Sequence, residues 1–307
     1  MKRLSHLLII SKDTNFFTDR NYAHLEKALA KSVTVTTWRS SGHIQAILKK
    51  LKHTPDFILI VNDIGDRFEP NVNGLSAVSI PSALFVNDVH RFTERRRQFL
   101  RRNPTTYLFS VTRDACLETY PAFTKRMRWL PHFVEPTIFR DYGLPKDYDF
   151  LLLGAVNHVY PFRQLILKTF ENHPGFHYQS HPGYSFQYEE TKQLVGTRYA
   201  MEINKAHVFF TCPSAYLYPV KKYYEALACR SLLLAPSFPE LEALGFIPGT
   251  HFVSVHEENL AEAATYYLNQ KKERYRIMEK GFSFVHRYHT TEKRSEDILK
   301  QIEFILS

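Results

Sequence analysis

The sequence has few of the residues that mark unusual classes of protein. Only 11 of its 307 residues are glycine and 14% are aromatic, which argues against long disordered or low-complexity regions. Its three cysteines, Cys116, Cys212 and Cys229, lie far apart without C-x-x-C spacing. The sequence therefore predicts neither a disulfide framework nor a zinc site, and it suits a reducing compartment.

Long hydrophobic runs are absent as well. No segment approaches the roughly 18 uninterrupted apolar residues of a membrane-spanning helix. The N-terminal segment MKRLSHLLIISKD has two basic residues, but its short apolar run ends at Lys12 and Asp13 without a small-residue cleavage site. We expect a buried strand there instead of a signal peptide, and hence a cytoplasmic protein.

What is present is an ordinary globular composition, with 44% hydrophobic and 23% charged residues. The length exceeds that of a usual single domain, so we expect two domains. The formal net charge of +9 indicates an anionic partner. Charge alone leaves nucleic acid, anionic lipid and a phosphorylated small molecule open.

Short apolar runs alternate with amphipathic stretches along the chain, for example HLLII, DFILIV and SALFV early on and DFLLLGA, HVFFTC and SLLLAP later. This alternation is typical of parallel sheets covered by helices. Three prolines and a glycine interrupt it between residues 131 and 147. We therefore predict an α/β protein with doubly wound domains over residues 1–130 and 148–285, joined by a linker over 131–147.

The segment KKYYEALAC predicts a short helix with Lys221, Lys222 and Glu225 on one face, because three and four residues separate them. One interpretation is a solvated face with a single ion pair. Pro219, however, places the helix start just before the lysines. Cations in a first turn are repelled by the positive end of the helix dipole, and a bound anion would offset that repulsion. The second interpretation is a phosphate site, with Glu225 binding a vicinal diol such as a ribose.

Here the residues resemble a known family. The segment KKYYEALACRSLLLAPSFPELEALGFIPGTHFVSVHEENLAEAATYYL, followed by RYHTTEKRSEDIL, resembles the donor-binding half of GT-B glycosyltransferases. The segment WLPHFVEPTIF is similar to their interdomain segment, and the likeness is nearest to the group related to the spore maturation protein CgeB. It covers most of residues 129–299. It implies two Rossmann-like domains facing a central cleft, with the last helix, residues 286–307, packing back toward the N-terminal domain.

The resemblance implies transfer of a sugar from a nucleotide-diphosphate donor, with a UDP-sugar as the first expectation. It implies that Glu225 binds the ribose and that Lys222, with Lys221 beside it, contacts the diphosphate. No metal or other cofactor is expected, and the acceptor, whether glycan, protein or phosphorylated molecule, stays open. Arg230 stands where relatives have glycine, and Leu217 stands where retaining relatives have a first glutamate, so stereochemistry is also open. The likeness also raises association with a spore as an alternative location, and the arginines of residues 91–102 raise peripheral contact with an anionic membrane.

Further donor-side candidates lie in loops after predicted strands, where open α/β sheets bind ligands. Gly154 follows FLLL and would let backbone approach a phosphate, and Arg163 falls in the first turn of the next helix. The alternative is an ordinary β-α turn with a surface arginine. Ser214 and Tyr216 in the loop TCPSAYLYP complete the candidate donor residues.

Asp88 and His90 are the candidate catalytic residues, in the loop after SALFV. Glycosyl transfer needs a base that deprotonates the acceptor hydroxyl, and either side chain could serve. We prefer His90, because the resembled family often carries D-x-H in this region. The alternative is that both residues stabilise a turn.

The segment HRFTERRRQFLRR holds six arginines between residues 91 and 102. A solvated helix face explains it, and so does contact with anionic lipid or an acceptor phosphate. Nucleic acid is not expected, because no interleaved aromatic platform accompanies the run. A catalytically silent binding protein of the same fold and a nucleic-acid-binding protein remain the alternative functions.

We expect no metal site. DYD at 147–149 matches the D-x-D motif of another glycosyltransferase fold, but it precedes a buried strand and we interpret it as chance. The histidines in candidate loop positions, His132, His181, His251 and His289, have no ligand spacing. The sequence also predicts a helix over 188–196 and a capping box formed by Ser237 and Glu240.

Overall fold

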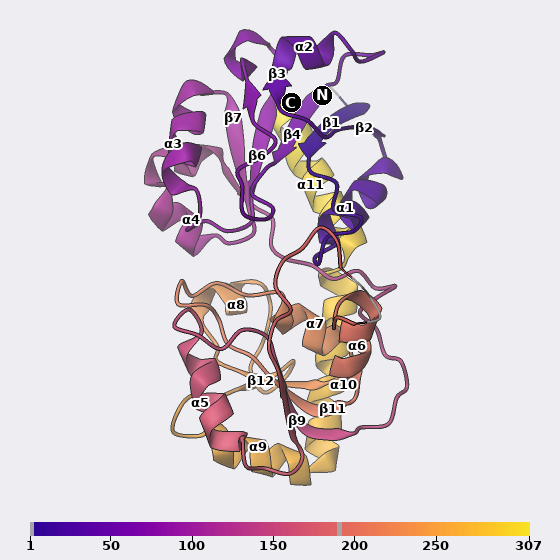
Figure 1. Ribbon diagram of the computed structural model, residues 1–307, viewed down its shortest axis with the longest axis vertical. Coiled ribbons are helices and arrows are strands. Elements are labelled where there is room, and N and C mark those ends of the chain that lie inside the picture. Colours follow the sequence, from indigo (N-terminus) through magenta and orange to yellow (C-terminus); the bar gives the residue numbers. More distant parts are fainter. Residues whose placement is uncertain (1–2, 189–191) are drawn as a thin grey trace. The chain divides into compact units, whose positions relative to one another are not determined.

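The computed structural model describes residues 3–188 and 192–307 (Figure 1). The chain divides into two compact units: unit 1 comprises residues 1–131 and 292–307, and unit 2 comprises residues 132–291. Residues 132–147, which the sequence predicts to be a linker, group with unit 2. There Leu144 N and Lys146 Nζ both donate hydrogen bonds to Asn204. None of the described helices is both long enough and apolar enough to cross a membrane.

Unit 1 is built on a parallel sheet with the strand order β2-β1-β4-β6-β7-β8. Strands β1, β4 and β6 are buried along their whole length, as expected for parallel strands covered on both faces. The strands are β1 (His6–Ser11), β2 (Thr34–Trp38), β4 (Phe57–Val61), β6 (Ser82–Val86), β7 (Thr106–Ser110) and β8 (Met127–Trp129). A small pair, β3 (Gly42–His43) with β5 (Val72–Asn73), lies outside this sheet.

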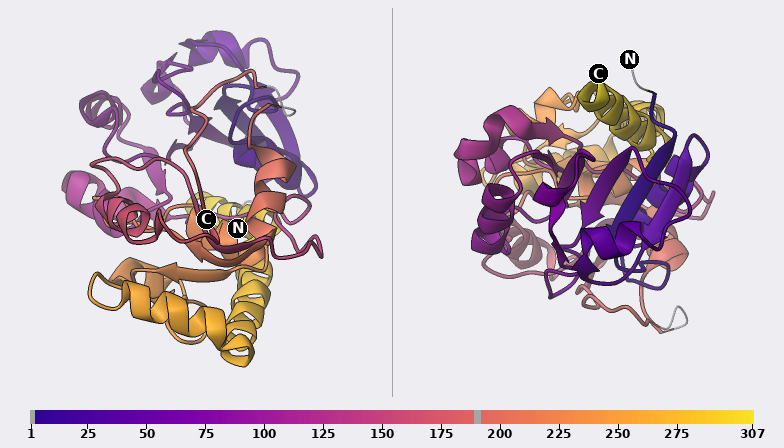
Figure 2. Two further views of the ribbon diagram at one scale, coloured as in Figure 1. Left: turned by 60° about the horizontal axis from the view of Figure 1, so that its bottom comes forward. Right: turned by 90° about the horizontal axis from the view of Figure 1, so that it is seen from above.

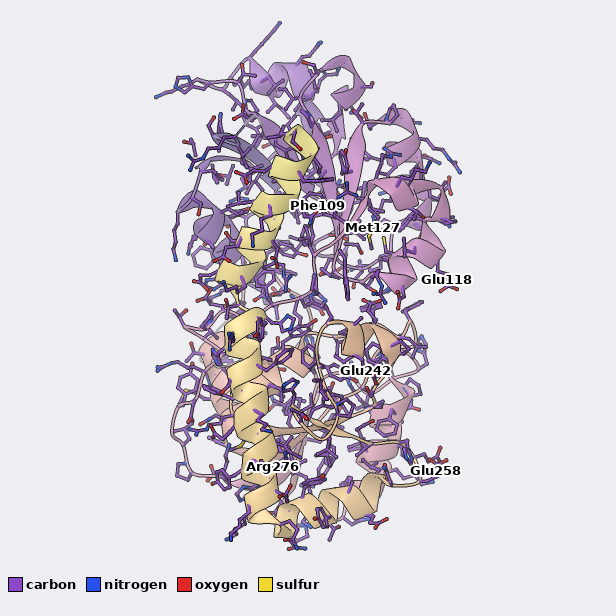
Figure 3. All side chains as sticks on the ribbon, turned by 180° about the vertical axis from the view of Figure 1, so that it is seen from behind. Phe109, Glu118, Met127, Glu242, Glu258 and Arg276 are labelled. Atoms are coloured by element: carbon purple, nitrogen blue, oxygen red, sulfur yellow. The ribbon has the colours of Figure 1, made fainter. Side chains whose placement is uncertain are left out.

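Helices cover both faces of the sheet of unit 1. The last helix, α11, lies behind the strands in Figure 1 and in front of them in Figure 3, where Phe109 of β7 is labelled. Its Phe304 ring lies 5.6 Å from the guanidinium carbon of Arg128 in β8. The helices are α1 (Asn21–Ala30), α2 (Ile44–Leu48), η1 (Leu75–Ala77), α3 (Thr93–Arg102), α4 (Asp114–Thr119), η2 (Pro121–Arg126) and α11 (Thr291–Leu306).

Unit 2 has a second parallel sheet with the order β10-β9-β11-β12-β13. Its strands are β9 (Tyr148–Leu153), β10 (Phe176–Gln179), β11 (Ala206–Phe210), β12 (Leu232–Ala235) and β13 (Val253–Ser254). Its helices are α5 (Pro161–Phe170), α6 (Gly196–Asn204), α7 (Lys222–Ala228), α8 (Pro239–Ala243), α9 (Leu260–Asn269) and α10 (Lys271–Tyr288). Figure 2, left, shows α9 beside the start of α10, and these two helices are in contact.

Alternate residues of these strands pack into different cores. Leu151, Phe209 and Leu233 belong to the core shared with α6 and α7. Phe150 and Phe210, on the opposite face, belong to the core shared with α5 and α9. A period of two with apolar residues on both faces confirms the predicted covered parallel sheet. Because the strands are apolar on both faces, polar side chains gather at the strand ends.

Two local predictions are wrong. Ser237 and Glu240 form no capping box: α8 begins one residue later than the motif requires, after extended Phe238. The Ser237 hydroxyl donates instead to Glu242, at 2.7 Å; Figure 3 labels Glu242 on this helix. Of the helix predicted over 188–196, residues 189–191 lie outside the described chain. Residues 192–195 are not helical. Helix α6 begins at Gly196, which has a φ of 54° and comes directly after the extended residue Val195.

A buried ion pair organises the loop between β6 and α3 in unit 1. Arg96 and Asp63 are both fully buried, and the guanidinium donates to Asp63 Oδ2 at 3.1 Å. Arg96 also donates to the Tyr120 hydroxyl at 2.6 Å and to the carbonyls of Val89 and Arg91. Burial raises the pKa of Asp63, and the charge of Arg96 opposes that rise. The pair therefore fixes the loop that carries Asp88 and His90.

We predict that Arg96→Ala lowers the free energy of unfolding by about 3–5 kcal/mol, because it leaves Asp63 buried without its counter-charge. Urea unfolding at neutral pH measures the loss. Arg95→Ala is the matched control on the same helix, since that side chain is exposed and should change stability by less than about 0.5 kcal/mol. Equal effects of the two substitutions would show that the buried pair does not hold this unit together.

Candidate functional site

Two cationic side chains meet at the carboxyl end of β9 in unit 2. Gly154 follows this strand and has a φ of 123°, a conformation that favours glycine. A Cβ atom at Gly154 would lie 2.8 Å from Lys222 Cε and 3.0 Å from Arg163 Nη1. The absence of a side chain at Gly154 therefore lets Arg163 and Lys222 approach the same point.

Arg163 is not the surface arginine of the alternative interpretation. The side chain is 3% exposed, and it donates to the carbonyl of Ala155 at 3.1 Å and to Thr211 Oγ1 at 3.3 Å. Its guanidinium carbon lies 3.9 Å from the centroid of the Tyr160 ring. Among the described residues, no hydrogen-bond partner reaches its buried Nε atom. Arg163 is thus anchored while keeping donor capacity at the end of β9.

A chain of hydrogen bonds joins Lys222 to Glu225 through a tyrosine of α6. Lys222 Nζ donates to the Tyr199 hydroxyl at 3.0 Å, and that hydroxyl donates to Glu225 Oε2 at 2.9 Å. Glu225 is only 8% exposed, so the solvated-face interpretation is wrong. Helix α7 is buried on more sides than its residue spacing predicts, because Tyr223 and Ala226 are also fully buried.

Burial lowers the pKa of Lys221 and Lys222 to about 8, although the charge of Glu225 works in the opposite direction. His181 belongs to the same surroundings. Burial, and then the charges of Lys222 and Arg163, lower its pKa to about 4. Among the described residues, the cluster at neutral pH therefore holds a neutral histidine and three cationic side chains beside one carboxylate, Glu225. Such an excess of positive charge favours binding of an anion.

The loop after β11 comes just before α7 in the sequence. It carries the two remaining donor candidates, Ser214 and Tyr216. Ser214 is buried, and its hydroxyl accepts the backbone N–H of Tyr216 at 3.3 Å. Ala215 N donates to the carbonyl of Val159 at 2.8 Å, which ties this loop to the loop after β9. Tyr216 is 45% exposed. Ser214 thus shapes the loop, whereas Tyr216 presents a ring to the solvent.

Arg230 ends α7 in the position that usually requires glycine. Its φ is 56°, its N–H donates to the carbonyl of Leu227, and the N–H of Ser231 donates to the carbonyl of Ala226. These two bonds form a Schellman motif, in which glycine is preferred because the backbone is left-handed. The left-handed backbone at position 230 therefore explains why the resembled family has glycine there.

The Arg230 side chain is held away from the Lys222 cluster. It donates to Asp141 Oδ2 at 2.6 Å and to Glu279 of α10. Its guanidinium carbon also lies 5.7 Å from the Phe282 ring. Glu225 and Lys222 are thus unaffected by the bulk of Arg230.

The catalytic candidates lie in unit 1, in the loop between β6 and α3. His90 is exposed and Asp88 is partly buried, 3.8 Å from Arg91 Nη1. Asp63 Oδ2 accepts the backbone N–H of Asp88 at 3.3 Å, so the loop is anchored from below. Although His90 is exposed, partial burial of its ring, and then the charges of Arg91 and Arg96, lower its pKa. A neutral imidazole at pH 7 can accept a proton.

The donor candidates Gly154, Arg163, Lys222 and Glu225 are thus brought together within unit 2, and Asp88 and His90 lie together within unit 1. Sequence reasoning missed Tyr199, which binds both Lys222 and Glu225. No local pattern marks it, because the contact joins two helices. Reasoning also missed Arg96, since nothing in an arginine run distinguishes its buried member.

The remaining polar candidates lie elsewhere. DYD, residues 147–149, lies at the start of β9, at the end opposite Gly154. His251 Nδ1 accepts the N–H of Ile247, and His289 lies 3.2 Å from the Leu244 carbonyl. The His132 ring stacks edge-to-face on Tyr224. Within residues 3–188 and 192–307, no group of three or more His, Cys, Asp or Glu side chains could hold a metal ion.

Comparison with known proteins gives a family match for part of the chain and a shared fold for nearly all of it. Residues 149–300 match the family described as glycosyl transferase-like. No curated protein matches the sequence. The description of this family does not name the CgeB-like group that the sequence resembles.

Several solved structures share the fold at very low identity. HepE from Anabaena in complex with UDP and glucose has a TM-score of 0.63 and 7% identity, covering 98% of this chain and 100% of that one. A glycosyltransferase from Rickettsia africae has a TM-score of 0.61 and 10% identity, with full coverage of both chains. An alpha-glucosyltransferase in complex with UDP and a mismatched DNA has a TM-score of 0.62 and 11% identity, covering 98% of this chain and 100% of that one.

All three are similar to this chain over nearly their full length, and the predicted GT-B architecture is confirmed. Residues 149–300 therefore match a family described as glycosyl transferase-like, in a chain that has the GT-B fold.

Proposed function

We propose that the protein transfers a sugar from a nucleoside diphosphate sugar, with UDP as the first nucleotide to test, to an acceptor hydroxyl. The observation that carries the proposal is that Arg163 and Lys222 meet at Gly154, at the carboxyl end of β9, with Lys221 and Glu225 close enough to Lys222 to interact with it. Open α/β sheets bind ligands at this end of their strands. The sequence alone further supports membership of the CgeB-like group and a cytoplasmic location.

The diphosphate and the ribose of a nucleoside diphosphate each have a counterpart in the cluster. The three cations offer charge-assisted hydrogen bonds to the diphosphate, so chain cations rather than a metal ion neutralise the leaving group. Glu225 accepts hydrogen bonds from the ribose hydroxyls, while Tyr199 holds its other oxygen. The complexes of HepE with UDP-glucose and of the alpha-glucosyltransferase with UDP support a nucleotide of this kind.

The acceptor hydroxyl loses its proton as the bond between sugar and phosphate breaks. We assign this step to His90, because its lowered pKa keeps the imidazole neutral, with Asp88 beside it. The Asp63–Arg96 pair holds the backbone of this loop and so orients the base.

Glu225→Ala should weaken UDP binding about 10- to 100-fold, because charge-assisted hydrogen bonds contribute about 1.5–3 kcal/mol. Thermal shifts with UDP, GDP, ADP and TDP, followed by titration calorimetry with the best ligand, measure the effect. Arg230→Gly is the matched control at the end of the same helix and should leave the affinity unchanged. No shift with any of the four nucleotides in the wild type would overturn the donor-site assignment.

UDP affinity should fall as the pH rises through about 8, because Lys221 and Lys222 lose the protons that attract the diphosphate. The expected loss between pH 7 and 9 is about tenfold for each lysine that deprotonates. Calorimetry across this range measures it. Lys222→Arg should reduce the loss to the part that Lys221 contributes, because arginine stays charged. A wild-type affinity that is constant over this range would contradict the role of the lysines.

His90→Ala should lower the rate of UDP release from UDP-glucose, with or without an acceptor, by about 10²–10⁴-fold while leaving UDP affinity unchanged. A coupled assay for UDP measures turnover, and calorimetry measures binding. Thr93→Ala removes a hydroxyl that binds the His90 carbonyl, at 3.1 Å, and is the control for loop disturbance. Unchanged turnover in His90→Ala would exclude His90 as the base.

A further inference from the structure

The whole excess of positive charge lies in unit 1. By sequence this unit has 24 lysines and arginines against 15 aspartates and glutamates, a formal charge of +9, whereas unit 2 has 16 of each. The donor candidates Arg163, Lys221 and Lys222 are therefore local features of a neutral unit. The charge of unit 1 points to a second anionic ligand, different from the nucleotide.

Unit 1 contains a groove of about 600 Å³ on one side of α3; Figure 1 shows this helix beside the sheet. Arg95, Gln98, Phe99, Arg102 and Asn103 form one wall. The other wall is the segment around β5 and η1, with Asn71, Asn73, Gly74 and Ser76. Gly74 has a φ of 78°, and a Cβ atom there would lie 2.2 Å from the His43 ring, so this wall requires glycine at that position.

The arginines of the run have different environments. Arg96 is buried, Arg97 donates to the Thr119 carbonyl, and Arg101 faces Glu94 at 3.9 Å. Arg95 and Arg102 line the groove, and the part of the chain that the structure describes offers neither of them a carboxylate within 4.0 Å. They are seven residues apart on one helix face, so their backbones are about 10 Å apart along the groove.

Between these two cations the groove presents hydrogen-bonding groups. Asn71, Asn73 and Gln98 are exposed amides and Ser76 is an exposed hydroxyl. Amides donate and accept, which matches the hydroxyl groups of a sugar. Nucleobases would need exposed aromatic faces for stacking, but Phe68 is 4% exposed and Phe99 is partly buried.

We propose that this groove binds an acidic saccharide, with two anionic groups about 10 Å apart on Arg95 and Arg102 and the hydroxyls between them on the amides. Because α3 begins directly after the loop that carries His90, the saccharide is the acceptor or its continuation. The assignment of the acceptor rests on the proposed function, whereas binding by the groove does not.

The test is titration calorimetry with a tetramer of galacturonic acid as probe, without donor, at low and at physiological salt. The wild type should bind this probe and should not bind maltotetraose, which is neutral. Arg95→Gln and Arg102→Gln should each weaken binding about tenfold, since each removes one charge-assisted contact. Both variants should keep the UDP affinity of the wild type, so a failed groove is distinguishable from a failed donor site.

Arg101→Gln is the matched control, because it removes the same charge from the same helix outside the groove. An equal loss in Arg101→Gln would overturn the proposal, since attraction would then come from net charge alone. Tighter binding of a short single-stranded DNA than of the tetramer would overturn it in favour of nucleic acid. Absence of binding by the tetramer at low salt would also overturn it.

Discussion

Charge imbalance at the end of β9 is the constraint on which the account of unit 2 depends. Within the part of the chain that the structure describes, Arg163, Lys221 and Lys222 lie with a single carboxylate, Glu225, where water is partly excluded. Burying these charges is unfavourable unless a counter-charge arrives, and the lowered lysine pKa values result mainly from that burial. The fold tolerates the arrangement because Gly154 provides space and Tyr199 links the lysine to the carboxylate.

The two units differ in how their charges are distributed. Unit 2 is neutral overall and concentrates positive charge at one strand end, whereas unit 1 carries the net charge on its surface. Within the arginine run of α3 the same residue type serves different purposes. Arg96 is a buried structural cation that holds the His90 loop, and Arg95 and Arg102 line a groove. Substitutions at neighbouring positions of this helix should therefore have unrelated consequences.

Much of the fold could be predicted from the sequence, because parallel strands buried on both faces are continuous apolar runs such as FILIV and LLLA. The face shared by Lys222 and Glu225 also followed from helical spacing. Tyr199 did not, since its contact with that face depends on how α6 packs on α7. Burial of Glu225 was missed for the same reason. An argument from helical spacing assumes that one side of the helix faces solvent, whereas α7 is enclosed by other elements.

Arg230 illustrates how a departure from a family pattern can be conformational. The left-handed backbone that explains the glycine of relatives is retained here by an arginine whose side chain pairs with Asp141 and Glu279. The sequence could not decide this, because both ion pairs bridge residues far apart in the chain.

A crystal structure of the protein with UDP tests the central claim most directly. The account predicts the diphosphate within hydrogen-bond distance of Arg163 and Lys222, above Gly154, and the ribose hydroxyls on Glu225. A nucleotide bound elsewhere on the chain, with these three side chains unchanged, would contradict it.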